Sequence, residues 1–83
     1  MTAKEAYEKT LWNKLPEELR REVEDCIKRG KFSAYFYESI SPILFDDSYY
    51  GILAELDYSI EISKIQHKEN NLIDNKLIIS WRE

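Results

Sequence analysis

Side chains that could carry out chemistry are few in this chain and lie far apart. Cys26 is the only cysteine and His67 the only histidine among 83 residues, which excludes an intrachain disulfide and a zinc site with several thiolates. Cys26 falls on the apolar stripe of an expected helix and His67 in a polar loop, so we interpret them as a buried and a solvent-exposed residue. We therefore expect no catalytic residue, no metal and no cofactor.

Adjacent carboxylates are the next pattern that could act as acid and base or hold a cation. Asp46 and Asp47 directly precede an apolar helical pattern, and we interpret them as helix-capping residues. Acidic and basic residues of segment 17–29 fall at i,i+4 spacing, which indicates ordinary ion pairs on a solvated helix. Gly30 and Gly51 are isolated, so there is no Gly-rich phosphate loop. The sequence thus predicts a protein that is not an enzyme.

Tyrosine and acidic residues are concentrated in the middle of the chain. Residues 32–63 contain five of the six tyrosines, six Asp or Glu and no Lys or Arg, within a net charge of −4. This composition argues against nucleic-acid binding, because phosphate backbones are bound by Lys and Arg. Tyrosine is enriched in protein–protein interfaces, so we expect a protein partner. The candidate partner-binding residues are Tyr35, Tyr37, Tyr50, Glu61 and Ile78.

Two other functions stay open on the sequence alone. A nucleotide signal could bind at an oligomer interface, with tyrosines stacking on the base and Lys28, Arg29, Lys31 and Arg82 contacting phosphates. An acidic mimic of nucleic acid would need a denser negative surface than a net charge of −4 supplies. A homo-oligomer is compatible with each function, because a small open sheet can pair with itself.

Three helices are expected from caps and apolar spacing. A capping box at residues 2–5 predicts a first helix, and Pro16 and Gly30 bound a second helix with an apolar stripe. Asp46 precedes a third helix, in which apolar residues recur at i, i+3, i+4 and i+7. Ser41-Pro42 indicates a turn or a first helical turn before that helix.

Three strands are expected from alternation of side chains, at residues 31–38, 58–63 and 76–82. Leu72 and Ile73 stand out in the polar segment 66–75, and we interpret them as an early start of the last strand. Residues 77–79 are apolar on both faces, which favours a central position for this strand. Phe32, Phe36 and Ile62 are among the residues expected on the core side.

These elements predict an α+β fold in one domain of residues 1–83. Two N-terminal helices precede a β-α-β-β unit that forms a three-stranded mixed sheet with helices mainly on one face. The first two strands should be parallel, because a helix connects them, and the last two antiparallel. Residues 1–15 could be an arm appended to a core of residues 16–83, or could fold over the outer sheet face.

The chain resembles small bacteriophage-encoded proteins over about residues 16–83. The motifs that carry this resemblance are Gly30-Lys31-Phe32-Ser33-x-Tyr35-x-Tyr37, Leu53-x-x-Leu56-x-Tyr58-x-Ile60-x-Ile62 and Leu77-Ile78-Ile79-Ser80-Trp81. Asp57 stands where those proteins usually have Gly, and segment 41–48 is longer than theirs. The resemblance implies an accessory or host-modulating factor without enzymatic activity. We expect a host-cell cytoplasmic location and no membrane segment, since no basic-then-apolar leader and no run of about 18 apolar residues occurs.

Overall fold

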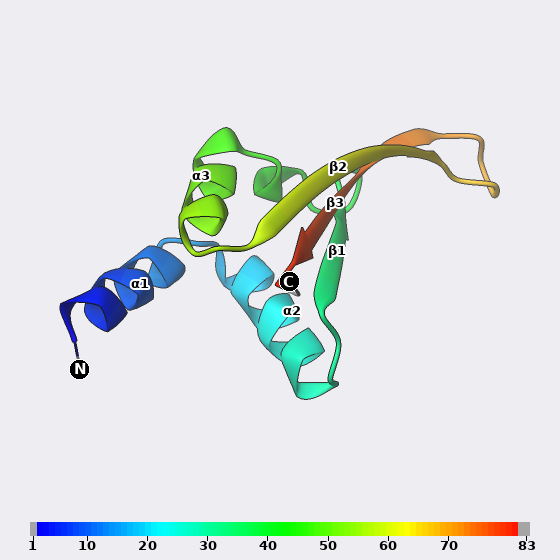
Figure 1. Cartoon of the computed structure of the whole chain (residues 1–83). Coiled ribbons are helices and arrows are strands. Elements are labelled where there is room, and N and C mark those ends of the chain that lie inside the picture. The colour runs from blue at the N-terminus through cyan, green and yellow to red at the C-terminus, as the bar shows by residue number, and fades with distance from the viewer. Residues whose placement is uncertain (1, 82–83) are drawn as a thin grey trace.

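The computed structural model describes residues 2–81, with helices and strands in the order expected from the sequence. The elements are α1 (Ala3–Asn13), α2 (Glu17–Lys28), β1 (Ser33–Tyr37), the 3-10 turn η1 (Pro42–Leu44), α3 (Asp47–Glu55), β2 (Ser59–Gln66) and β3 (Ile73–Ser80) (Figure 1). This arrangement confirms the α+β class. No helix within residues 2–81 has the length and apolar character needed to cross a bilayer.

Helix ends follow the local rules that the sequence indicated. The Thr2 hydroxyl accepts a 3.2 Å hydrogen bond from the Glu5 amide, and Asp46 accepts one of 2.9 Å from the Ser48 amide. The hydrogen bonds from Ser48 lower the pKa of Asp46. Gly30 ends α2 at φ +76°, a left-handed conformation that L side chains disfavour. The residue types at these positions therefore set the helix boundaries.

β3 lies between β1 and β2, which confirms its predicted central position. Both pairings are antiparallel, so the expectation of a mixed sheet was wrong. β1 and β2 do run in the same direction, but β3 separates them and no parallel pair forms. The physical reason is the tight β2–β3 hairpin, which forces antiparallel pairing and places β3 in the gap beside β1.

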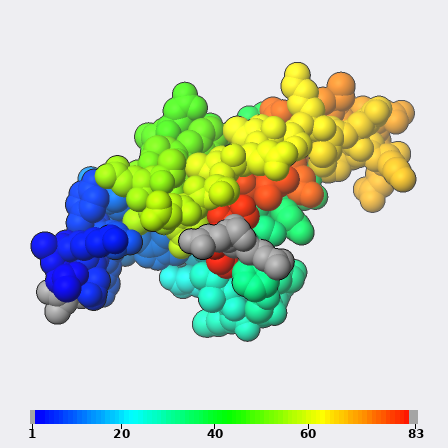
Figure 2. Space-filling model, in the orientation of Figure 1, coloured from blue at the N-terminus to red at the C-terminus, as the bar shows by residue number. Residues whose placement is uncertain are grey.

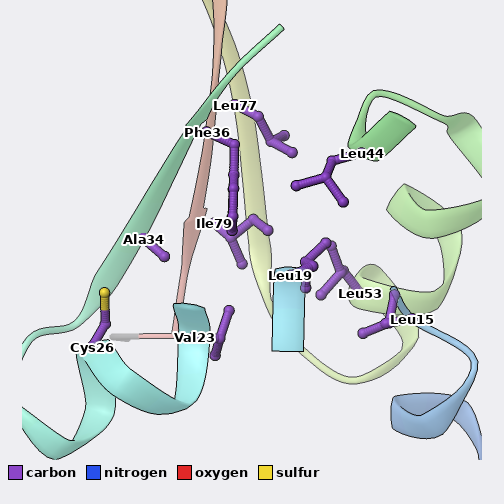
Figure 3. Packing of buried hydrophobic residues seen from close by; sticks show 10 residues of the cluster. All are labelled: Leu15, Leu19, Val23, Cys26, Ala34, Phe36, Leu44, Leu53, Leu77 and Ile79. Atoms are coloured by element: carbon purple, nitrogen blue, oxygen red, sulfur yellow. The ribbon is translucent and has the colours of Figure 1, made fainter. Parts of the chain in front are cut away.

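The hydrophobic core lies on one face of this sheet, the inner face, beneath α2, α3 and η1 (Figure 3). Leu77 and Ile79 of β3 and Leu19 of α2 are fully buried there. The remaining buried members of the cluster are Leu15, Val23, Cys26, Ala34, Phe36, Leu44 and Leu53. The helices α2 and α3, the turn η1 and the strands β1 and β3 each contribute buried residues to this cluster.

Strand ends and rim residues differ from the sequence expectation. β3 begins at Ile73, which confirms the early start, whereas β1 is shorter than expected and leaves Phe32 53 % exposed. Ile62 is 48 % exposed, because β2 and β3 continue as a hairpin past the helices that cover the core. Figure 2 shows this hairpin, in yellow and orange, projecting at the end of the molecule opposite α1. Alternation predicts which face a side chain occupies but not how far the helices reach.

The first helix packs against α3 and not against the outer face of the sheet. The Tyr7 hydroxyl donates a 2.7 Å hydrogen bond to Glu55, and Leu11 is buried. Next to this contact, the rings of Trp12 and Tyr58 lie 6.0 Å apart between centroids. Figure 1 shows α1 to one side of the sheet. The alternative in which residues 1–15 fold over the outer face is therefore wrong.

Two glycine replacements test the assignment of Gly30 to a helix end and of Gly51 to a helix interior. Gly51 lies inside α3, and no atom lies within 4 Å of a Cβ built there or at Gly30. Gly51→Ala should raise the free energy of unfolding by about 1 kcal/mol, because alanine loses less backbone entropy in a helix. Gly30→Ala should lower it by about 1–2 kcal/mol, because its φ is positive. Urea unfolding followed by circular dichroism measures both, and equal effects of the same sign would contradict the assignment.

Candidate functional site

The candidate site is the outer face of the sheet, which is the face opposite the core. Tyr35 of β1 pairs with Ile78 of β3, and Ile78 in turn pairs with Glu61 of β2. These three predicted residues form one row across all three strands. Tyr37 pairs with Lys76 in the next row. Four of the five candidate partner-binding residues therefore lie together on one face.

Tyr35 is the most prominent side chain of this face, with 55 % of its surface exposed. The ammonium group of Lys76 lies over its ring, 4.2 Å from the centroid, which is a cation–π contact. Glu61 is exposed in the same row, on the other side of β3 from this ring. Residues 32–63 contain no Lys or Arg, so the composition of this segment indicated no cation near its tyrosines. Lys76 belongs to β3, and the pairing of β3 with β1 brings it next to Tyr35.

Tyr37 takes part in a polar cluster at the far end of the same face. Its ring packs edge-on against the imidazole of His67, with centroids 5.6 Å apart. His67 Nε2 lies 2.9 Å from Asp74 Oδ2 and donates to it, because an ionised carboxylate can only accept. The His67 side chain is 33 % exposed, so the expectation of a solvated loop histidine was wrong. The β2–β3 hairpin places His67 next to Tyr37 of the sheet.

Asp74 is the centre of this cluster and is almost fully buried, with 4 % of its side chain exposed. Its carboxylate accepts 2.5 Å and 3.1 Å bonds from the hydroxyl and amide of Ser39, and one of 2.9 Å from the Asn75 amide. The hydrogen bonds from the Ser39 hydroxyl and from His67 lower the pKa of Asp74 to about 2. The carboxylate therefore stays ionised and ties the turn after β1 to the hairpin.

Tyr50 is the candidate residue that does not join this face. It lies on α3 and packs against the hydrophobic core. Burial, followed by the negative charges of Asp47 and Glu38, raises the pKa of its phenol. Spacing along a helix shows which side of the helix a residue occupies but not which part of the sheet that side meets. The sequence alone therefore could not place Tyr50 relative to the sheet face.

Three of the four basic residues of the nucleotide alternative lie at or just beyond the C-terminal end of α2. Lys28 and Arg29 end α2, where the helix dipole is negative, and Arg29 is paired with Asp25 at 2.8 Å. Lys31 is exposed just beyond them, and Arg82 lies outside the described residues. The C-terminal end of a helix carries a partial negative charge that repels anions, so it is a poor place to bind phosphate groups.

Cys26 lies in the core cluster, and the carboxylates of residues 2–81 belong to no metal-binding group. Burial and a 3.5 Å hydrogen bond to Glu22 raise the pKa of the Cys26 thiol, which keeps it protonated at neutral pH. Within residues 2–81 there is no group of three or more His, Cys, Asp or Glu that could hold a metal ion. The predicted structural role of Cys26 agrees with its burial in the core cluster.

A groove beside β1 is lined by Glu18 and Glu22, two residues that the sequence indicated to be ordinary solvated charges. Among the i,i+4 pairs expected in segment 17–29, Arg21 with Glu17 and Arg29 with Asp25 form ion pairs, whereas Glu24 with Lys28 is not among the ion pairs of residues 2–81. Glu18 and Glu22 of α2 line a groove of about 210 Å³ together with Tyr35, Tyr37, Ile40 and Ser41. We call this groove the β1 groove. No local signal could reveal it, because its two sides are brought together by the turn at Gly30.

Comparison with known proteins adds no family. No protein-family model matches the chain, and no curated protein and no solved structure matches it.

Acid titration tests the polar cluster. Asp74 ionises at pH about 2 in the folded protein, against an ordinary value of 3.8. The unfolded chain binds more protons between these values, so this carboxylate's contribution to stability is complete above pH about 4 and is lost as the pH falls to about 2. Asp74→Asn should lower stability at neutral pH and flatten the fall in unfolding free energy over this range. Urea unfolding at a series of pH values measures it.

Glu69→Gln provides the matched control for that titration. Glu69 is exposed in the hairpin loop and forms no hydrogen bond within residues 2–81, so its replacement should leave the slope unchanged. A wild-type slope retained in Asp74→Asn would contradict the assigned hydrogen-bond cluster.

Proposed function

We propose that this protein is a non-enzymatic interaction protein whose outer sheet face binds a protein partner. The observation that carries the proposal is the exposed Tyr35 ring on a face that no helix of the described chain covers. Tyr35, Ile78 and Glu61 offer an aromatic ring, an apolar side chain and a charge in one row. This combination of a rigid aromatic anchor and a polar surround is typical of protein interfaces.

Rigidity of the backbone under Tyr35 supports this proposal. β1 is paired with β3 along its whole length, and Phe36 next to Tyr35 is buried in the core. The cation–π contact with Lys76 also restrains the ring before any partner arrives. A side chain that is ordered in the free protein loses less entropy on binding, which increases affinity for a given contact area.

The biological setting is part of the proposal. The motifs that resemble small bacteriophage-encoded proteins suggest an accessory or host-modulating role in the cytoplasm of a host cell. The partner would then be a bacterial protein, and a homo-oligomer is compatible with the same exposed face.

A pair of tyrosine replacements tests the proposal. Tyr35→Ala should reduce capture of a partner from bacterial lysate by at least about tenfold, because truncation of a central aromatic residue typically costs 2 kcal/mol or more. Tyr7→Ala is the matched control, since Tyr7 is 52 % exposed on α1 and distant from the sheet. Quantitative mass spectrometry of proteins retained on the immobilised variants measures the difference.

Circular dichroism should show both variants folded, so that a loss of capture reports on binding. Proteins retained equally by wild type, Tyr35→Ala and Tyr7→Ala would show that the outer face is not the binding surface. A loss in Tyr7→Ala alone would move the interface to α1.

A further inference from the structure

β1 is an edge strand, and its free side carries unpaired backbone groups. The Phe32 carbonyl accepts from the Trp81 amide and the Glu38 amide donates to the Asn75 carbonyl, so the even-numbered residues of this segment hydrogen-bond to β3. Hydrogen bonds alternate along an antiparallel strand, and the amides and carbonyls of Ser33 and Tyr35 therefore point away from β3. The Tyr37 carbonyl is satisfied by the amides of Ile40 and Ser41. The free edge ends there.

The β1 groove runs along this edge and is negatively charged. Glu18 accepts a 3.0 Å hydrogen bond from the Ser41 hydroxyl and Glu22 accepts one from the Cys26 thiol, both neutral donors. Neither carboxylate forms an ion pair within residues 2–81. A cationic group that approaches the edge would therefore meet two carboxylates that have no ion-pair partner within residues 2–81.

The spacing of these carboxylates matches the repeat of a strand. Glu18 and Glu22 are four residues apart on α2, which separates them by about 6 Å along the helix axis. Side chains at i and i+2 of an extended segment are about 6.6–6.8 Å apart. β1 runs back alongside α2 after the turn at Gly30, so a strand added to β1 would also run along α2 (Figure 1).

From this geometry we infer that the free edge of β1 binds an extended, cationic peptide segment, which adds a fourth strand to the sheet. Lys or Arg at positions i and i+2 of the segment would contact Glu18 and Glu22. Its alternate side chains would lie beside Tyr35 and Ile40, which is 74 % exposed, so apolar residues fit there. Main-chain hydrogen bonds supply affinity and the alternating side chains supply specificity. The inference rests on the proposed function, since it assigns the part of the partner that is bound.

Two capped, fluorescent peptides of identical composition test the inference. In Thr-Lys-Val-Lys-Val-Thr both lysines fall on one face of a strand, whereas in Thr-Lys-Val-Val-Lys-Thr they fall on opposite faces. The first should bind at least about tenfold more tightly by fluorescence anisotropy, with affinity that falls as salt is added. Hydrogen exchange followed by NMR should show slower exchange of the Ser33 and Tyr35 amides when the first peptide is bound.

Charge-neutralising variants provide the matched control. The double variant Glu18→Gln, Glu22→Gln should weaken binding of the first peptide about tenfold, while its glutamines keep the acceptors for Ser41 and Cys26. The double variant Glu24→Gln, Glu69→Gln removes the same charge from exposed positions outside the groove and should change binding less than twofold.

Several results would overturn the inference. Absence of binding, equal binding of the two peptides, or binding without protection of the Ser33 and Tyr35 amides would each exclude an added strand. A dimer in light scattering with these amides protected before peptide is added would show that a second copy occupies the edge. If Tyr35→Ala lost a partner that Glu18→Gln, Glu22→Gln retained, the proposed function would stand and the edge inference would fall.

Discussion

The position of β3 between β1 and β2 is the constraint on which the rest of the structure depends. Leu77 and Ile79 point from β3 into the core and are fully buried, so the central strand is also the centre of hydrophobic packing. With β3 in the middle, β1 and β2 both become edges, and the same register carries Ile78 and Lys76 to the opposite face. One strand thus organises the core, the candidate face and the free edge.

Covering elements are limited in a chain of 83 residues, and this limit leaves surfaces open. α2, α3 and η1 are used on the inner face, and α1 packs on the outside of α3. No helix of residues 2–81 covers the outer face or the projecting β2–β3 hairpin. Exposed apolar side chains such as Ile40 and Ile73 are the result.

Charge in this protein is organised by tertiary contacts more than by its position in the sequence. The acidic middle segment contributes Glu61 to the outer face, whereas Lys76, which lies over the Tyr35 ring, comes from β3 outside that segment. Glu18 and Glu22, the carboxylates at the β1 edge, come from residues 1–31, which contain eight Lys or Arg and seven Asp or Glu. The negative charge of Asp74 is stabilised by hydrogen bonds from Ser39 and His67.

The sequence by itself determined the features that depend on a few neighbouring residues. Caps at Thr2 and Asp46, the helix stop at Gly30 and the strand alternation were predictable, because the hydrogen bonds and periodicities involved span about four positions. Apolar character on both faces of residues 77–79 also indicated the central strand. Only the tertiary structure decided which distant side chains meet. Ser41 reaches Glu18 across 23 positions and Ser39 reaches Asp74 across 35, and such contacts follow from strand register and helix docking, which no local pattern encodes.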